Sequence, residues 1–275
     1  EDALVLKNHS DVDNFTLDTS AILSQLSGSD ATVDEALALL QSASGASNGL
    51  TDESAISITD TVSELDNHFS DLKTGGGLES VASVKATLAS VADAEAFVGD
   101  LASPPTDATY ANPELSSIID EFELESSLLN SVSNFAELTV SQALSILKAT
   151  NADQIPSITI EDNYANLTNQ NASSINSGLS TQAVPTILSN GIQIGSGTSA
   201  VNFTFKDVHI KDVSLSEAID LNNNYPNFEF SYSLVHSEFN STNFIDASID
   251  QAIALTHASN FPGTSNLSIE DTADN

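Results

Sequence analysis

The chain has 275 residues, of which 40% are hydrophobic, so it can bury one large core or two ordinary ones. Its net charge is −33, because 39 acidic residues are balanced by only 6 basic residues, all of them lysine. Binding to nucleic acid or to an anionic membrane surface requires many basic side chains, so these partners are excluded. The absence of cysteine excludes disulfides and thiol chemistry. No apolar run approaches the length of a membrane span, so direct membrane insertion is not expected.

An eight-residue pattern that occurs four times predicts the starts of helices. It places Glu or Gln three residues after a Ser or Thr, and aliphatic residues follow at helical spacing. The hydroxyl and the Glu or Gln side chain can then cap the helix start reciprocally, in a capping box. The copies cover residues 32–39, 139–146, 214–221 and 248–255. After three of these helices, Gly45, Asn151 and Asn260 are expected to adopt the left-handed conformation that ends a helix.

A second pattern, aliphatic–x–Ile–x–Asp, predicts a short strand and occurs at residues 56–61, 158–163 and 267–272. The Asp of each copy (Asp60, Asp162 and Asp271) is predicted to be the N-cap of a following helix. Such a unit of capped helix, short strand and Asp-capped helix cannot bury both faces alone, so neighbouring units must stack. The copies are irregularly spaced and the last one ends the sequence. We therefore expect a longer parent protein, cut within a repeat.

Apolar spacing predicts further elements between these copies. Residues 78–101 are predicted to form a helix, and a second helix is expected to begin at Asn112-Pro113-Glu114 and to run toward residue 129. Residues 184–206 alternate apolar and polar side chains between Gly/Ser turns, which is typical of a hairpin. Residues 228–232 predict another strand.

The expected fold class is therefore mixed α/β, with an irregular repeat of capped helix, short strand and Asp-capped helix and a more β-rich C-terminal part. Prolines and polar residues after Leu101 indicate a linker. The predicted regions are 1–102 (first repeat region), 103–112 (linker), 113–177 (second repeat region) and 178–275 (β-rich segment with two further copies).

The pairing of the helix pattern at 32–39 with the strand pattern at 56–61 resembles repeats in very large secreted bacterial surface proteins. These are S-layer-type and adhesin-type proteins, notably of marine and cyanobacterial origin. The resemblance implies an extracellular location at the cell surface, a structural or adhesive function and often calcium binding. It does not identify a binding residue in this chain.

Two short motifs match catalytic or cofactor patterns, but their context favours loops. Gly45–Gly49 fits G-x-S-x-G, yet the expected order around it is helix, loop, strand rather than strand, turn, helix. Gly195–Ala200 fits G-x-G-x-x-A, yet a strand pattern follows it where a dinucleotide site needs a helix. No two histidines lie four residues apart, as a metal-binding H-E-x-x-H motif requires. The histidines are His9, His68, His209, His236 and His257. We therefore do not expect an enzyme.

Calcium is the one cofactor that the sequence suggests, because hard oxygen ligands are abundant. Asp11 and Asp13 form the nearest local cluster, but they lack the glycine of a calcium loop. Asp60, Asp162 and Asp271 recur at equivalent positions and are also candidate ligands. The alternative interpretation of these three is helix capping.

These observations favour a structural or adhesive extracellular module that self-associates as a homo-oligomer or lattice of like chains. Divalent cations could bridge carboxylates across the contacts, and a surface glycan is a further candidate partner. Two alternatives stay open. One is a structural component of a phage virion or tail fibre. The other is a fragment of a secreted hydrolase that uses a pair of carboxylates.

Overall fold

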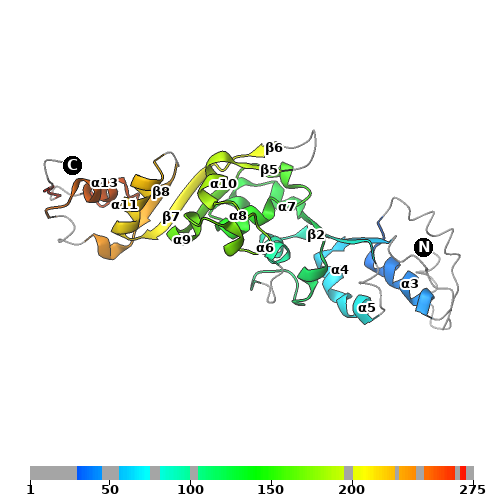
Figure 1. Cartoon of the computed structure of the whole chain (residues 1–275). Coiled ribbons are helices and arrows are strands. Elements are labelled where there is room, and N and C mark those ends of the chain that lie inside the picture. Colours follow the sequence, from blue (N-terminus) through cyan, green and yellow to red (C-terminus); the bar gives the residue numbers. More distant parts are fainter. Residues whose placement is uncertain are drawn as a thin grey trace. The chain divides into compact units, whose positions relative to one another are not determined.

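The computed structural model describes residues 30–44, 56–74, 81–99, 105–194, 201–226, 229–239, 245–263 and 267–270. Helices alternate with parallel strands, and one antiparallel pair is present, so the mixed α/β fold class is confirmed. The chain divides into two compact units (Figure 1). Unit 1 comprises residues 1–128 and 148–152, and unit 2 comprises residues 129–147 and 153–275.

Unit 1 is built on a parallel sheet with the strand order β1-β2-β3. These strands are Ser57–Thr61, Ser83–Ala89 and Glu121–Leu124. Ala31 extends the sheet beyond β1 through an isolated parallel bridge to Ile58. The helices are α3 (Val33–Ser44), α4 (Val62–Asn67), α5 (Phe69–Thr74) and α6 (Val91–Gly99), with a 3-10 turn η2 (Leu115–Ile118); α7 (Ser126–Leu129) lies at the end of the unit.

Unit 2 has a parallel sheet of the same kind, with the order β4-β7-β8. These strands are Thr159–Asn163, Asp207–Val213 and Ser231–Leu234. Leu138 bridges to Ile160 as Ala31 bridges to Ile58. The helices are α8 (Val140–Ile146), α9 (Tyr164–Leu167), α10 (Val184–Asn190), α11 (Leu215–Asn224) and α13 (Ile249–His257). The 3-10 turns η3 (Val132–Phe135), η4 (Ala152–Gln154), η5 (Ala172–Ser174) and η7 (His236–Glu238) complete the described elements.

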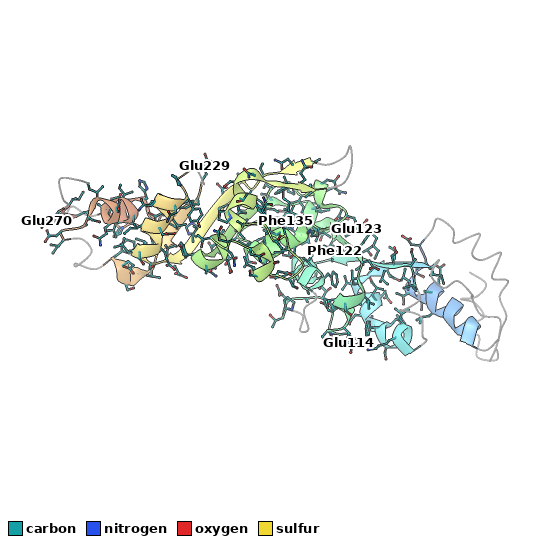
Figure 2. All side chains as sticks on the ribbon, viewed as in Figure 1. Glu114, Phe122, Glu123, Phe135, Glu229 and Glu270 are labelled. Atoms are coloured by element: carbon teal, nitrogen blue, oxygen red, sulfur yellow. The ribbon has the colours of Figure 1, made fainter. Side chains whose placement is uncertain are left out.

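Within each of the two three-stranded sheets, successive strands are parallel neighbours, so each connection between them is a crossover. Right-handed crossovers that advance in one direction place their helices on the same face of the sheet. Burial follows this arrangement, because alternate residues such as Ile58, Val84 and Phe122 are buried. Phe122 in unit 1 and the fully buried Phe135 in unit 2 are labelled in Figure 2. The opposite face of each sheet carries polar side chains.

The two units share one order of strands and helices, and this order explains the irregular spacing of the capped helices. Thr32, Thr139 and Ser248 each follow directly after a residue that forms an isolated β-bridge. Each begins a helix, and the bridge partner lies in the chain after that helix. Ser214 instead begins the helix after the central strand, and its counterpart in unit 1 is Ser90. The four copies thus occupy two different positions of one larger repeat.

Three sequence-based predictions of secondary structure are wrong. Residues 83–89 form β2 rather than part of a helix, and only residues 91–99 are helical. The helix expected after Asn112 is replaced by η2, β3 and α7. Residues 184–190 form α10, with Pro185 in its first turn, where a proline is tolerated. Short apolar runs do not fix their own period, and pairing with neighbouring strands decides the outcome for β2 and β3.

The C-terminal half confirms the predicted hairpin strands. β5 (Ile192–Ile194) and β6 (Val201–Phe203) pair in antiparallel fashion. A strand therefore follows the glycine-rich motif, as the hairpin interpretation requires. The segment that joins β5 to β6 and the Gly45–Gly49 motif lie outside the described residues.

The described part of the expected linker, residues 105–112, lies within unit 1. Tyr110 is buried and its ring stacks on Phe97 at 5.4 Å between centroids. The backbone N–H groups of Ala111 and Asn112 both donate to the carboxylate of Asp66, at 2.9 Å. The chain passes from one unit to the other after Leu128, Leu147 and Ala152. Among the described residues, no helix is both long and apolar enough to cross a membrane.

Candidate functional site

Asp60 and Asp162 hold the start of one helix against the end of a strand in their respective units. Asp162 Oδ2 accepts from the backbone N–H of Val140 at 2.9 Å, and Asp60 Oδ2 accepts from Val33 at 3.0 Å. The other oxygen of each carboxylate accepts from the next backbone N–H, at 2.8 Å in both cases. Each Asp thus binds a helix N-terminus, where the helix dipole favours a negative charge.

The prediction that these two aspartates are N-caps of the following helices is wrong. The caps are Thr61 and Asn163, whose side chains accept from Glu64 N–H and Asn166 N–H. The physical reason is strand alternation, because Asp60 lies two residues after the buried Ile58 and shares its face of the sheet. That face is covered by helices, so the carboxylate meets the preceding helix.

Asn151 and Asn260 also have a role that differs from the prediction. They are absent from the described non-glycine residues with positive φ, which are Leu88, Glu137, Asp212 and Asp246. Each amide instead pairs with both backbone groups of one strand residue. Asn151 bonds Leu124 N–H and C=O, each at 3.0 Å, and Asn260 bonds Leu234 N–H at 3.0 Å and C=O at 2.8 Å. Gly45, the third predicted cap, lies outside the described residues.

The polar face of each sheet carries one lysine on its central strand. Lys85 of β2 forms an ion pair with Glu123 of β3 at 2.6 Å, and Lys211 of β7 pairs with Glu161 of β4 at 3.3 Å. Figure 2 labels Glu123 beside the buried Phe122, its neighbour in β3. These two lysines offset carboxylate repulsion across adjacent strands, although pairs this exposed contribute little to stability.

Hydroxyl groups complete the hydrogen bonds on this polar face. Ser83 Oγ donates to Ser57 Oγ at 3.0 Å, and Thr59 Oγ1 donates to Asp30 at 2.7 Å. The ring nitrogens of His209 lie 2.8 Å from Ser231 Oγ and 3.3 Å from Ser233 Oγ. A catalytic triad needs a carboxylate on one of these nitrogens, so this contact does not have the geometry of a triad.

Two buried or half-buried tyrosines connect the helices of unit 2. Tyr164 of α9 donates to Asp220 Oδ2 of α11 at 2.5 Å; burial and this carboxylate raise the pKa of its phenol to about 12. Tyr232 of β8 donates to the carbonyl of Ala254 in α13 at 2.8 Å and accepts from Asn222 of α11. Burial raises the pKa of the Tyr232 phenol. These contacts fix α11 and α13 around β8.

The predicted calcium ligands are not gathered in one described site. Asp60 and Asp162 lie in different units, each with backbone N–H partners. Asp11, Asp13 and Asp271 lie outside the described residues. Within the described ranges, no group of three or more His, Cys, Asp or Glu residues is placed to hold a metal ion. Calcium binding stays a prediction.

Comparison with protein families, with curated proteins and with solved structures gives no match. The resemblance to large bacterial surface proteins therefore rests on the repeated sequence motifs.

Proposed function

We propose that this chain is a structural or adhesive module of an extracellular surface layer, which self-associates with other copies. The observation that carries the proposal is the recurrence of one architecture, a bridge residue, a capped helix and a strand whose Asp binds the helix start. It occurs at Val33 with Asp60 and again at Val140 with Asp162. Repetition of a stacking unit is typical of proteins whose role is to extend a scaffold.

The charge distribution suggests how copies would approach one another. The net charge of −33 keeps single chains apart at low ionic strength. In seawater-like salt the Debye length falls to roughly 3–4 Å, so repulsion between copies is mostly screened. Exposed carboxylates on the polar sheet faces, such as Glu121 and Asp207, are then available for bridging by a divalent cation.

The test is the oligomeric state of the purified chain, measured by light scattering and analytical ultracentrifugation in low and high NaCl, with CaCl₂, MgCl₂ or EDTA. We expect assemblies at high salt or with divalent cations, and their loss after EDTA addition or dilution of the salt. NaCl at matched ionic strength separates screening from cation bridging. A chain that stays monomeric under all these conditions would contradict the proposal.

Charge-reversal variants locate the contact. Glu121→Lys and Asp207→Lys change the polar sheet faces, whereas Asp153→Lys changes an exposed site outside them. If the sheet faces form the contact, only the first two variants lower the cation requirement. An equal effect of all three would mean that net charge alone controls assembly.

A further inference from the structure

Unit 2 has a groove between α11, β8 and α13, three elements that lie side by side (Figure 1). Its volume is about 520 Å³, and a second hollow of about 320 Å³ adjoins it. Tyr225 and Pro226 line both hollows and stand between them. We call the two hollows together the Tyr225 groove. A site of this form suits an elongated ligand that passes over the Tyr225–Pro226 turn.

The groove is lined by aromatic rings and by uncharged hydrogen-bonding groups. Tyr225 and Phe230 are half-buried rings on the larger hollow. Amides dominate the polar lining, with Asn222 and Asn223 in the larger hollow and Gln170 in the smaller one. None of the described lining residues is a lysine, and Asp250 is the one carboxylate among them.

Several lining side chains are held in place by their neighbours. Tyr232 is buried at the base and bonded to both flanking helices. The amide of Gln170 donates to the Tyr225 hydroxyl at 3.3 Å. In contrast, Asn223 and His257 are exposed, and their side chains have no hydrogen-bond partner among the described residues. The groove therefore combines a fixed base with polar groups available to a ligand, which lowers the entropic cost of binding.

We propose that the Tyr225 groove binds a neutral oligosaccharide. A sugar ring presents an apolar C–H face, which packs on rings such as Tyr225 and Phe230, and hydroxyl groups around its edge. Amides and imidazole can both donate to and accept from those hydroxyls. An anionic ligand is disfavoured, because the lining offers Asp250 and no lysine.

The corresponding connection in unit 1 differs in a way that supports a specialised role for this groove. Residues 90–120 join β2 to β3, and this longer segment carries Tyr110, which is buried against Phe97 of α6. Residues 214–230 join β7 to β8 in unit 2. This shorter connection places Tyr225 and Phe230 on the groove. Two rings of the unit 2 connection therefore line the groove, whereas Tyr110 of the unit 1 connection is buried.

This inference goes beyond the proposed self-association and is tested separately. Binding is measured with the full chain in EDTA and low salt, where we expect it to stay dispersed. The probes are an array of neutral oligosaccharides (glucans, mannans, galactans and chitin fragments), sulfated and uronic-acid oligosaccharides, and a lysine-rich peptide. Titration calorimetry follows any hit. Loss of saccharide binding and loss of assembly are then distinct outcomes.

We expect at least one neutral oligosaccharide to bind, and the anionic ones not to bind. The paired substitution Tyr225→Ala with Phe230→Ala should weaken binding about tenfold or more, since both stacking rings are lost. Phe261→Ala removes another half-buried ring of unit 2, outside the groove, and should leave binding unchanged. Asn223→Ala alters an exposed amide, so it tests the groove without threatening the fold. The proposal is overturned if no neutral saccharide binds, if the Tyr225→Ala/Phe230→Ala pair and Asn223→Ala bind normally, or if only the lysine-rich peptide occupies the groove.

Discussion

The carboxylate of Asp162 accepts a hydrogen bond from the backbone N–H of Val140, twenty-two residues earlier in the chain, at 2.9 Å. Val140 is the first residue of α8, and Asp162 is the fourth residue of β4. One side chain therefore satisfies a helix N-terminus and fixes the helix to the sheet. The equivalent contact between Asp60 and Val33 lies within unit 1, so each unit contains this link between a helix start and the sheet.

The first prediction concerns the stability of the Asp162 contact. Asp162 is only 4% exposed and also accepts from the side-chain amides of Asn163 and Asn166. Asp162→Ala leaves the buried Val140 N–H and several part-buried donors without an acceptor, so we expect unit 2 to lose about 3 kcal/mol of unfolding free energy. Urea denaturation followed by circular dichroism measures the change.

Asp153→Ala is the matched control for Asp162→Ala, because Asp153 is exposed in the same unit. It should change the unfolding free energy by less than about 0.5 kcal/mol. Asp162→Asn separates charge from shape, and we expect it to be destabilising too, because one amide position donates where an acceptor is needed. If Asp162→Ala is as mild as the control, the contact has no structural role.

The second prediction concerns the side-chain amide of Asn260, which bonds the last residue of β8. Asn260 bonds both backbone groups of Leu234, whereas an aspartate at this position could accept but not donate. Asn260→Asp should therefore cost about 1–2 kcal/mol of unfolding free energy. Asn223→Asp adds the same charge at an exposed position of α11 and serves as the control. Equal effects of the two variants would assign the loss to charge repulsion instead.

The sequence predicted the positions that recur, but it assigned some of them the wrong role. Capping boxes at Thr139, Ser214 and Ser248 form as expected, because the pattern is local and its partners lie three residues apart. Asp60 and Asp162 recur at equivalent positions of the sequence pattern, yet the helix N-termini that they bind are more than twenty residues away. Local spacing cannot identify a partner that only the sheet brings close.

The elements that sequence reasoning missed have the same origin. Ser90 begins a helix with Asp93 in the place of Glu or Gln, so it does not match the capping-box pattern of the other helices. The residues that line the Tyr225 groove come from α10, α11, β8, α13 and the segments beside them, and no motif links Tyr225 to His257. The aromatic residues near 225–232 were a usable signal, but a strand prediction alone did not indicate a groove.

The third prediction concerns backbone strain in the central strands. Asp212 has φ of 53° and Leu88 has φ of 58°, each at a break in strand register. This left-handed conformation costs a residue with a Cβ roughly 1 kcal/mol, and glycine adopts it freely. Asp212→Gly should therefore raise the unfolding free energy of unit 2 by about 0.5–1 kcal/mol, measured by thermal and urea denaturation.

Two controls separate strain from other effects of Asp212→Gly. Lys211→Gly places glycine in the strand next to it, where added backbone freedom should destabilise the fold by about 1 kcal/mol. Asp212→Ser removes the charge but keeps a Cβ, so it reports the effect of charge with the strain retained. A stabilisation that Asp212→Ser reproduces in full would assign the gain to charge.

The fourth prediction is a loss of stability at alkaline pH that depends on Tyr164. The pKa of its phenol is about 12 in the folded chain and about 10 when unfolded, so the folded state holds the proton more tightly. The contribution to stability is thus complete below about pH 10 and is lost as the pH rises to about 12. We expect the unfolding free energy to fall across this window, and Tyr164→Phe to make the fall less steep.

The raised pKa of Tyr232 acts in the same direction, so some slope should remain in the variant. Unfolding free energies from about pH 9 to 12, with phenolate absorbance recorded in parallel, measure both effects. An unchanged slope in Tyr164→Phe would mean that the contact with Asp220 does not hold this proton.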